Sequence, residues 1–128
     1  MRLKPIAKVV NGVTGRVDDW SDITSKLVFE KEYVEGLYKL GHFEHIWVIW
    51  GFDRAPKGWI PKIHPRRDPS IPLVGVFASH SPTRPNKIGL TLVELVSIRR
   101  NVVTVKGLDA FDGSPVYDIK PYEPEIDY

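Results

Sequence analysis

Apolar residues of this chain recur mainly in short stretches with alternating spacing, which is typical of β-strands. Strands are predicted at residues 3–10, 25–29, 44–52, 73–79, 88–99, 102–107 and 116–119. The stretch at 73–79 is predicted to be buried, because Val74, Val76 and Phe77 are β-branched or aromatic. Residues 31–40 show the spacing of a helix, and Gly41 follows as a stop. Many short strands with one short helix predict an all-β barrel or sandwich.

The strand at residues 44–52 is apolar on both faces. Val48 and Trp50 should point one way, and Trp47 and Ile49 the other. Such a strand is either buried on both sides or lies against a subunit partner. A chain of 128 residues has little interior in which to bury four tryptophans. We therefore expect a homodimer whose interface includes Trp47 or Trp50.

Charge is distributed unevenly along the chain, although the net formal charge is only +2. Residues 54–107 carry 10 basic and 2 acidic side chains, and residues 108–128 carry 1 basic and 6 acidic ones. A basic middle segment attracts a polyanion such as RNA. The alternative is that these charges pair with the acidic tail, through Glu123, Glu125 and Asp127.

Residues 53–67 are rich in proline and basic residues, which predicts an ordered surface excursion without regular structure. We expect this excursion to contact RNA together with Lys87. The predicted RNA-binding residues are Arg54, Lys57, Lys62, Arg66, Arg67 and Lys87.

Length and composition predict a single domain over residues 1–128. The chain has no cysteine, which excludes disulfides and fits a reducing cytoplasm. No apolar run has the length of a membrane span or a secretory signal, so we expect a cytoplasmic protein without a membrane anchor. The glycine-rich fingerprint of dinucleotide sites, the P-loop and the nucleophile elbow are all absent from the sequence. His42 and His45 would point to opposite faces of a strand, so no metal site is expected.

The polar loop at residues 80–87 separates two apolar stretches. Pro82 and Pro85 fix two φ angles and hold Ser81 and Arg84 in extended geometry. The loop is therefore expected to be rigid and to hold several donors in a small space, as in a ligand clamp. The guanidinium of Arg84 suits a carboxylate or a phosphate. The alternative is an ordinary polar hairpin loop.

Two further groups near the C-terminus carry candidate chemistry. Gly113 permits close backbone approach, so the loop at 112–115 could present backbone groups to an adenine or a ribose; the alternative is a plain turn. Asp118, Lys120 and Tyr122 alternate and should share one face of a strand. They are either a structural ion pair or the edge of an active site.

Two long runs carry a resemblance to a known family. The runs GVFASHSPTRPNKIG at residues 75–89 and LDAFDGSPVYDIKPY at 108–122 resemble the two signatures of the TsaA-like family, which includes the tRNA methyltransferase TrmO. A weaker match, FEHIW at 43–47, is followed by the Pro-Arg of residues 65–66. The sequence departs from the family at Ser79, His80 and Lys87, where relatives usually have Thr, Arg and Pro.

The resemblance implies a small single-sheet β-barrel that transfers a methyl group from S-adenosyl-L-methionine to N6 of a threonylcarbamoyl-adenosine beside a tRNA anticodon. The cofactor-binding positions that it implies are Asp53, Arg54, His80, Ser81, Arg84, Leu90, Asp112, Gly113, Ser114 and Pro115. The catalytic candidates are Asp118, Lys120 and Tyr122, with Asp118 as a possible proton acceptor.

Two other functions remain open at this point. One is an S-adenosyl-L-methionine-dependent enzyme with a different acceptor, and the other is a small RNA-binding barrel without catalysis. Bacterial relatives often carry an added C-terminal domain, so we expect the barrel of this chain to grip tRNA itself.

Overall fold

The computed structural model describes residues 1–52, 54–55 and 57–127. The chain divides into two compact units, a barrel unit formed by Met1–Gly51 with Gly89–Tyr128, and an insertion formed by Phe52–Ile88. Asp53, one of the predicted cofactor-binding residues, lies outside the described residues.

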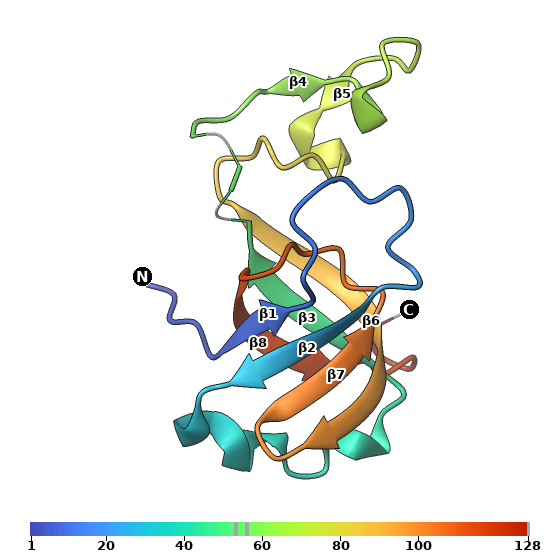
Figure 1. Ribbon diagram of the computed structural model, residues 1–128. Coiled ribbons are helices and arrows are strands. Elements are labelled where there is room, and N and C mark those ends of the chain that lie inside the picture. Colours follow the sequence, from blue (N-terminus) through green and yellow to red (C-terminus); the bar gives the residue numbers. More distant parts are fainter. Residues whose placement is uncertain (53, 56, 128) are drawn as a thin grey trace. The chain divides into compact units, whose positions relative to one another are not determined.

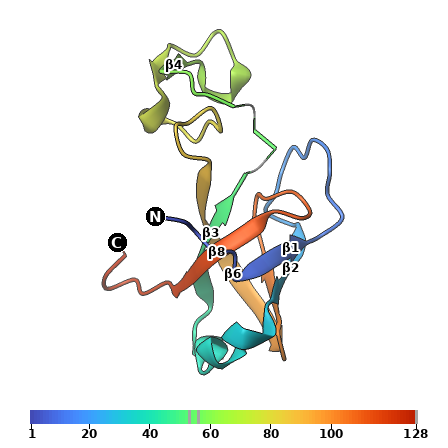
Figure 2. The ribbon, with the colours of Figure 1, turned by 90° about the vertical axis from the view of Figure 1, so that its left-hand side faces the viewer.

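The barrel unit is built from six strands that form one closed sheet in the order β1-β2-β7-β6-β3-β8 (Figures 1 and 2). The strands are β1 (Ala7–Val10), β2 (Thr24–Phe29), β3 (His45–Gly51), β6 (Ile88–Arg99), β7 (Val102–Lys106) and β8 (Pro115–Pro121). The antiparallel pairing of β1 with β8, at Ala7 and Val116, closes the barrel. This confirms the predicted all-β, single-sheet barrel.

Alternating apolar residues of the six strands fill the barrel interior. Val9, Val48, Val93 and Val105 are among the fully buried side chains of this core. In β3 the residues expected on one face do point inward, and Trp50 among them is only 7% exposed. Trp50 is therefore not an outward-facing interface residue, which removes it as a candidate for the dimer contact. Trp47 lies on the outer face and is half-buried.

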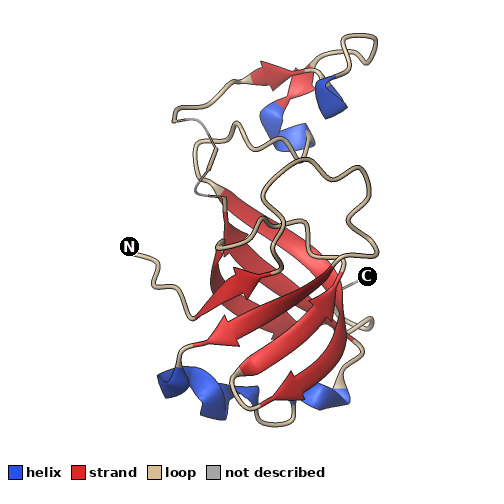
Figure 3. Cartoon of the chain, in the orientation of Figure 1, coloured by secondary structure: helices blue, strands red, loops and turns tan. Residues whose placement is uncertain are grey.

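Two short 3-10 helices follow β2 and cover one end of the barrel (Figure 3). The helix expected at residues 31–40 is present as η1 (Lys31–Leu37) and η2 (Leu40–His42). Lys39 between them has a φ of 67°, a left-handed conformation that ends the helical run. The side chain of Leu37 is buried and fixes η1 to the barrel unit.

The insertion contains little regular structure. Its elements are β4 (Lys62–Ile63), η3 (Pro65–Arg67), β5 (Val74–Gly75) and η4 (Val76–Ala78). The backbone N–H of Phe52 donates to the carbonyl of Lys87 at 3.1 Å, so the two ends of the insertion lie side by side. Residues 53–67 were expected to lack regular structure, whereas the structure has the short strand β4 and the helical turn η3 there.

The predicted buried strand at residues 73–79 is largely wrong. Only β5 is extended, and the chain then turns into η4, where Ser79 donates from both its amide and its hydroxyl to the carbonyl of Val76. Such local bonds compete with a strand ladder. The turn leaves Val76 buried but turns Phe77 outward, where it is 73% exposed.

Candidate cofactor and RNA sites

The loop at residues 79–87 is braced from within the insertion. Nη1 of Arg84 donates to the carbonyl of Ser79 at 2.7 Å and to that of Ser81 at 3.3 Å. The hydroxyls of Ser81 and Thr83 are 2.8 Å apart and hydrogen-bonded. The structure thus brings the predicted cofactor residues Ser81 and Arg84 together in one loop, and the neighbouring His80 is exposed.

Lys87 ties this loop to another segment of the insertion. Its ammonium donates to the carbonyls of Gly58 at 2.6 Å, Arg84 at 2.7 Å and Pro82 at 3.3 Å. An ammonium has three hydrogens, so these three bonds account for all of its donors. The geometry makes Lys87 a structural residue, and its contact with RNA stays a prediction.

We expect Lys87→Ala to lower the free energy of unfolding by about 1–3 kcal/mol, because three carbonyls lose a charged donor. The matched control is Lys57→Ala, which removes an exposed lysine of the same insertion. Thermal denaturation of both variants checks the expectation. Equal melting temperatures for the two would show that the carbonyl contacts of Lys87 do not stabilise the fold.

The loop at residues 112–115 is hydrogen-bonded to the turn at residues 11–12 of the barrel unit. Oδ1 of Asp112 accepts from the backbone N–H groups of Asn11 at 2.9 Å and Gly12 at 3.0 Å. Ser114 is buried, and its hydroxyl donates to the carbonyl of Phe111 at 2.7 Å. Gly113 has a φ of 87°, which explains why a glycine follows Asp112 in this turn. These bonds give Asp112 and Ser114 structural roles, and the cofactor contacts of Asp112, Gly113, Ser114 and Pro115 stay predictions.

Asp118 and Lys120 lie on the outer face of the barrel. They pair in register with Ile49 and Trp47 of β3, the residues that point away from the core. Their side chains form an ion pair of 3.3 Å, with the Asp118 side chain 50% exposed. The Tyr122 ring packs edge-on against Trp47 at a centroid distance of 6.1 Å. The arrangement contains the structural ion pair that the alternation allowed, and a catalytic role for the three residues is untested.

Leu90, another predicted cofactor residue, points away from the barrel core and is 60% exposed. It lies on β6, where exposed and more buried residues alternate. Leu90 therefore belongs to the outer surface of the barrel unit.

Sequence reasoning missed a hydrogen-bonded chain inside the barrel unit. Nε1 of Trp50 donates to the Thr91 hydroxyl at 3.1 Å, and that hydroxyl donates to Oδ1 of Asp109 at 2.6 Å. Alternation favours the opposite facing, with the apolar Leu90 and Leu92 inward, whereas the structure exposes both leucines and turns Thr91 toward Trp50. A polar residue at such a position needs a partner.

Five basic residues of the insertion are exposed, in contrast to Arg84 and Lys87. Arg54, Lys57, Lys62, Arg66 and Arg67 all fall in this class. Arg66 and Arg67 have φ values of 58° and 57°, a left-handed conformation that is strained for residues other than glycine and is found preferentially at functional sites.

Hydrogen bonds from the hydroxyl and the amide of Ser70 lower the pKa of the neighbouring Asp68 carboxyl.

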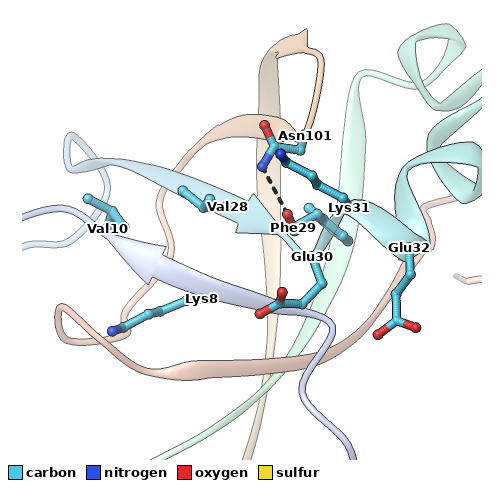
Figure 4. Close-up of a pocket in the computed structure, with 8 residues that line it drawn as sticks. All are labelled: Lys8, Val10, Val28, Phe29, Glu30, Lys31, Glu32 and Asn101. Atoms are coloured by element: carbon cyan, nitrogen blue, oxygen red, sulfur yellow. Dashed lines mark hydrogen bonds between the residues drawn. The ribbon is translucent and has the colours of Figure 1, made fainter.

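An open pocket lies on the barrel unit beside β1, β2 and the start of η1 (Figure 4). Its charged lining alternates in sign, with Lys8, Glu30, Lys31 and Glu32. The amide of Asn101 donates to the carbonyl of Phe29 at 2.9 Å and holds the β6–β7 turn against the end of β2. The pocket includes none of the predicted site residues, and we assign it no function.

Neither a cluster of metal-ligating side chains nor a membrane-spanning helix is found among the described residues. Within residues 1–52, 54–55 and 57–127, no three histidine or acidic side chains gather in a way that could hold a metal ion. No helix in the described part of the chain has both the length and the apolar character needed to cross a membrane.

The fold and its loops define a class of protein, a small closed antiparallel barrel with a basic, loop-rich insertion between the neighbouring strands β3 and β6. Residues 14–128 match the family described as the tRNA-methyltransferase O N-terminal domain. The chain belongs to this family, which confirms the resemblance carried by the two signatures.

Relatives of this chain differ in how much of their length it covers. It is 40% identical over 132 residues to an S-adenosyl-L-methionine-binding protein of Archaeoglobus fulgidus, covering 99% of this chain and 93% of that protein. It is 42% identical over 87 residues to the tRNA (adenine(37)-N6)-methyltransferase of Escherichia coli, covering 64% of this chain but 37% of the enzyme. A crystal structure of TrmO from Pseudomonas aeruginosa superimposes with a TM-score of 0.79 at 27% identity, covering 99% of this chain and 58% of that one.

Proposed function

We propose that this protein is an S-adenosyl-L-methionine-dependent methyltransferase that methylates N6 of a tRNA adenine, a threonylcarbamoyl-adenosine beside the anticodon. The observation that carries the proposal is the family match over residues 14–128, which includes both signature runs. It is supported by the names of two relatives, one an S-adenosyl-L-methionine-binding protein over nearly the same length and the other a tRNA (adenine(37)-N6)-methyltransferase.

The chemistry of the insertion loop fits one end of such a cofactor. The amino-acid part of S-adenosyl-L-methionine carries a carboxylate, and a guanidinium is the side chain best suited to bind a carboxylate. Both backbone hydrogen bonds of Arg84 start from Nη1, and they fix the orientation of the whole guanidinium. We therefore propose that Arg84 and the Ser81 hydroxyl contact the cofactor, with His80 beside them. Contacts by Asp53, Arg54, Leu90 and the loop at 112–115 remain expectations from the family resemblance.

The bound cofactor would supply a methyl group on a positively charged sulfur, which is already a good leaving group. The protein must then hold the acceptor nitrogen in line with that methyl group and exclude competing nucleophiles. The proton of the acceptor N–H must also leave. Asp118 is the candidate acceptor named from the sequence, although its ion pair with Lys120 gives it a second role.

Calorimetric titration with S-adenosyl-L-methionine, followed by a methyl-transfer assay on threonylcarbamoylated tRNA, tests this function. Micromolar binding and a methylated adenosine in the digested tRNA are expected. Cofactor binding without transfer to tRNA would favour an enzyme with another acceptor. If the protein shows neither cofactor binding nor methyl transfer, the result favours the non-catalytic RNA-binding barrel.

We also propose that two copies associate through the outer face of β6 and β3. Leu90, Leu92 and Val96 are exposed on β6, and Trp47 is half-buried on the neighbouring β3. A row of apolar side chains on a sheet surface is typical of an interface.

The cytoplasmic location likewise remains a proposal.

Light scattering is expected to give the mass of a dimer for the wild type and of a monomer for Leu92→Glu, because a two-fold interface would bury the new carboxylate twice. The matched control is Val10→Glu, which places the same charge at an exposed position of β1. A monomeric wild type at micromolar concentration, or a dimer that survives Leu92→Glu, would show that this face is not the interface.

A further inference from the structure

The insertion exposes two stacked aromatic rings. The rings of Trp59 and Phe77 are nearly parallel, with an interplanar angle of 10° and centroids 6.4 Å apart. Trp59 is 51% exposed and Phe77 73% exposed. Single exposed apolar side chains are common on protein surfaces, but two stacked rings that are both more than half exposed present parallel apolar faces to solvent.

A guanidinium borders these two rings. The guanidinium carbon of Arg84 lies 5.8 Å from the centroid of the Phe77 ring, within the range of a cation–π contact. Because the carbonyls of Ser79 and Ser81 hold Arg84, the guanidinium is positioned before any ligand arrives. We call Trp59 and Phe77 together the stacking platform; Arg84, proposed above to contact the cofactor, borders it.

Backbone hydrogen bonds fix the segments that carry the platform. The amide of Ile60, next to Trp59, donates to the carbonyl of Thr83 at 3.0 Å. The amide of Val76, next to Phe77, donates to the carbonyl of Pro61 at 2.9 Å. The carbonyl of Gly58, on the other side of Trp59, accepts from Lys87. The backbone that carries both rings is therefore fixed, which lowers the entropy cost of binding a flat ligand.

The charge of the insertion indicates which flat ligand the platform takes. Residues 52–88 contain 7 lysines and arginines and 2 aspartates. A basic surface with exposed aromatic rings is the composition of sites for single-stranded nucleic acid, where bases stack on the rings and cations hold the phosphates. A protein partner or a lipid surface would be matched less well by this combination.

We propose that the stacking platform binds an unpaired base of the RNA substrate, through the exposed faces of Phe77 and Trp59. The identification of the ligand as tRNA rests on the proposed function. The platform proposal adds the residues that distinguish an unpaired loop from a duplex. Stacking tolerates any base, because every base has a π-face. The platform therefore selects for an unstacked loop, while the neighbouring basic residues supply affinity without selectivity.

The test uses the full chain and two RNA probes of equal length and charge, a hairpin with an open loop and a fully paired duplex, at one salt concentration. Replacing Phe77 by leucine keeps an apolar side chain and removes the ring. We expect Phe77→Leu and Trp59→Leu each to weaken binding to the hairpin by roughly 5- to 150-fold and to leave duplex binding nearly unchanged. The control is Tyr38→Leu, which removes an exposed aromatic ring of the barrel unit and should change neither affinity.

A second readout is tryptophan fluorescence, because Trp59 is the one tryptophan of residues 52–88. Stacking of a base should quench it, and the quenching should vanish in Trp59→Leu. Melting temperatures show whether the variants fold. Unchanged hairpin affinity in a folded Phe77→Leu, or an equal loss for hairpin and duplex, would overturn the platform. Methyl transfer to tRNA by the wild type tests the proposed function separately. If the wild type transfers the methyl group and Phe77→Leu keeps its hairpin affinity, only the platform is rejected.

Discussion

Replacing Gly89 by alanine is expected to lower the free energy of unfolding by about 3 kcal/mol, because overpacking a filled core has this order of cost. A Cβ at residue 89 would overlap Cε2 of Trp50, at a separation shorter than real Cβ contacts show. The indole cannot move away easily, since it is buried and hydrogen-bonded to Thr91. Chemical denaturation of the purified variant measures the effect.

The control for this substitution is Gly36→Ala. Gly36 lies in η1, and a Cβ there would meet no atom within 4 Å. Alanine at 36 should therefore be neutral or slightly stabilising, because it restricts the unfolded chain. A Gly89→Ala protein as stable as Gly36→Ala would mean that the Trp50 side chain repacks at little cost. Should Gly89→Ala fail to fold, the double variant with Trp50→Phe should recover part of the stability, since the smaller ring leaves room for the methyl group.

The combined change of Lys57, Lys62 and Arg67 to alanine is expected to weaken tRNA binding by roughly 100-fold at 0.1 M salt, through the loss of about three phosphate contacts. The wild type should show a slope of log affinity against log salt of roughly −2 to −4, and the slope of the variant should be shallower by about 2 to 3. The reason is that all three side chains are exposed on the insertion, whose backbone is strained at Arg66 and Arg67. Affinity for S-adenosyl-L-methionine should be unchanged.

A charge-matched control removes Lys4, Lys26 and Lys39, three exposed lysines of the barrel unit. This control should keep the affinity and the salt slope of the wild type if the insertion is the RNA grip. The competing account pairs the basic residues with the acidic tail. It requires the opposite result for the insertion variant, a lower melting temperature with tRNA affinity preserved.

The barrel was predictable because its strands bury one face. Period-two alternation indicates the position of such a strand, and the observed bounds of β6 coincide with the predicted residues 88–99. It does not fix the facing of β6, because the apolar Leu90 and Leu92 lie on the exposed side. For β3, which is apolar on both faces, alternation put Val48 and Trp50 on one face but did not show that this face is the buried one. The family signatures added the chemistry, which neither composition nor periodicity contains.

The insertion was less predictable, because short-range polar contacts decide its structure. The bonds of Ser79 to Val76 turned an apolar run into η4 and exposed Phe77, so the stacking platform was hidden within a predicted strand. Long-range partners were equally invisible. Asp112 holds the turn at Asn11, which is 101 positions away, and Lys87 holds Gly58, which is 29 positions away.

The hydrogen bond from Phe52 to Lys87 means that the insertion leaves and re-enters the barrel unit at one point. On the barrel side, the flanking glycines are each pressed against a ring, Gly51 against Tyr117 and Gly89 against Trp50. Because β3 and β6 are neighbours in the sheet, the barrel does not depend on the length of the chain between them. This junction allows the insertion to be exchanged as one unit. Under the proposed RNA role of the insertion, a chimaera that carries a relative's insertion should keep the registers of the β-barrel and acquire the relative's RNA preference.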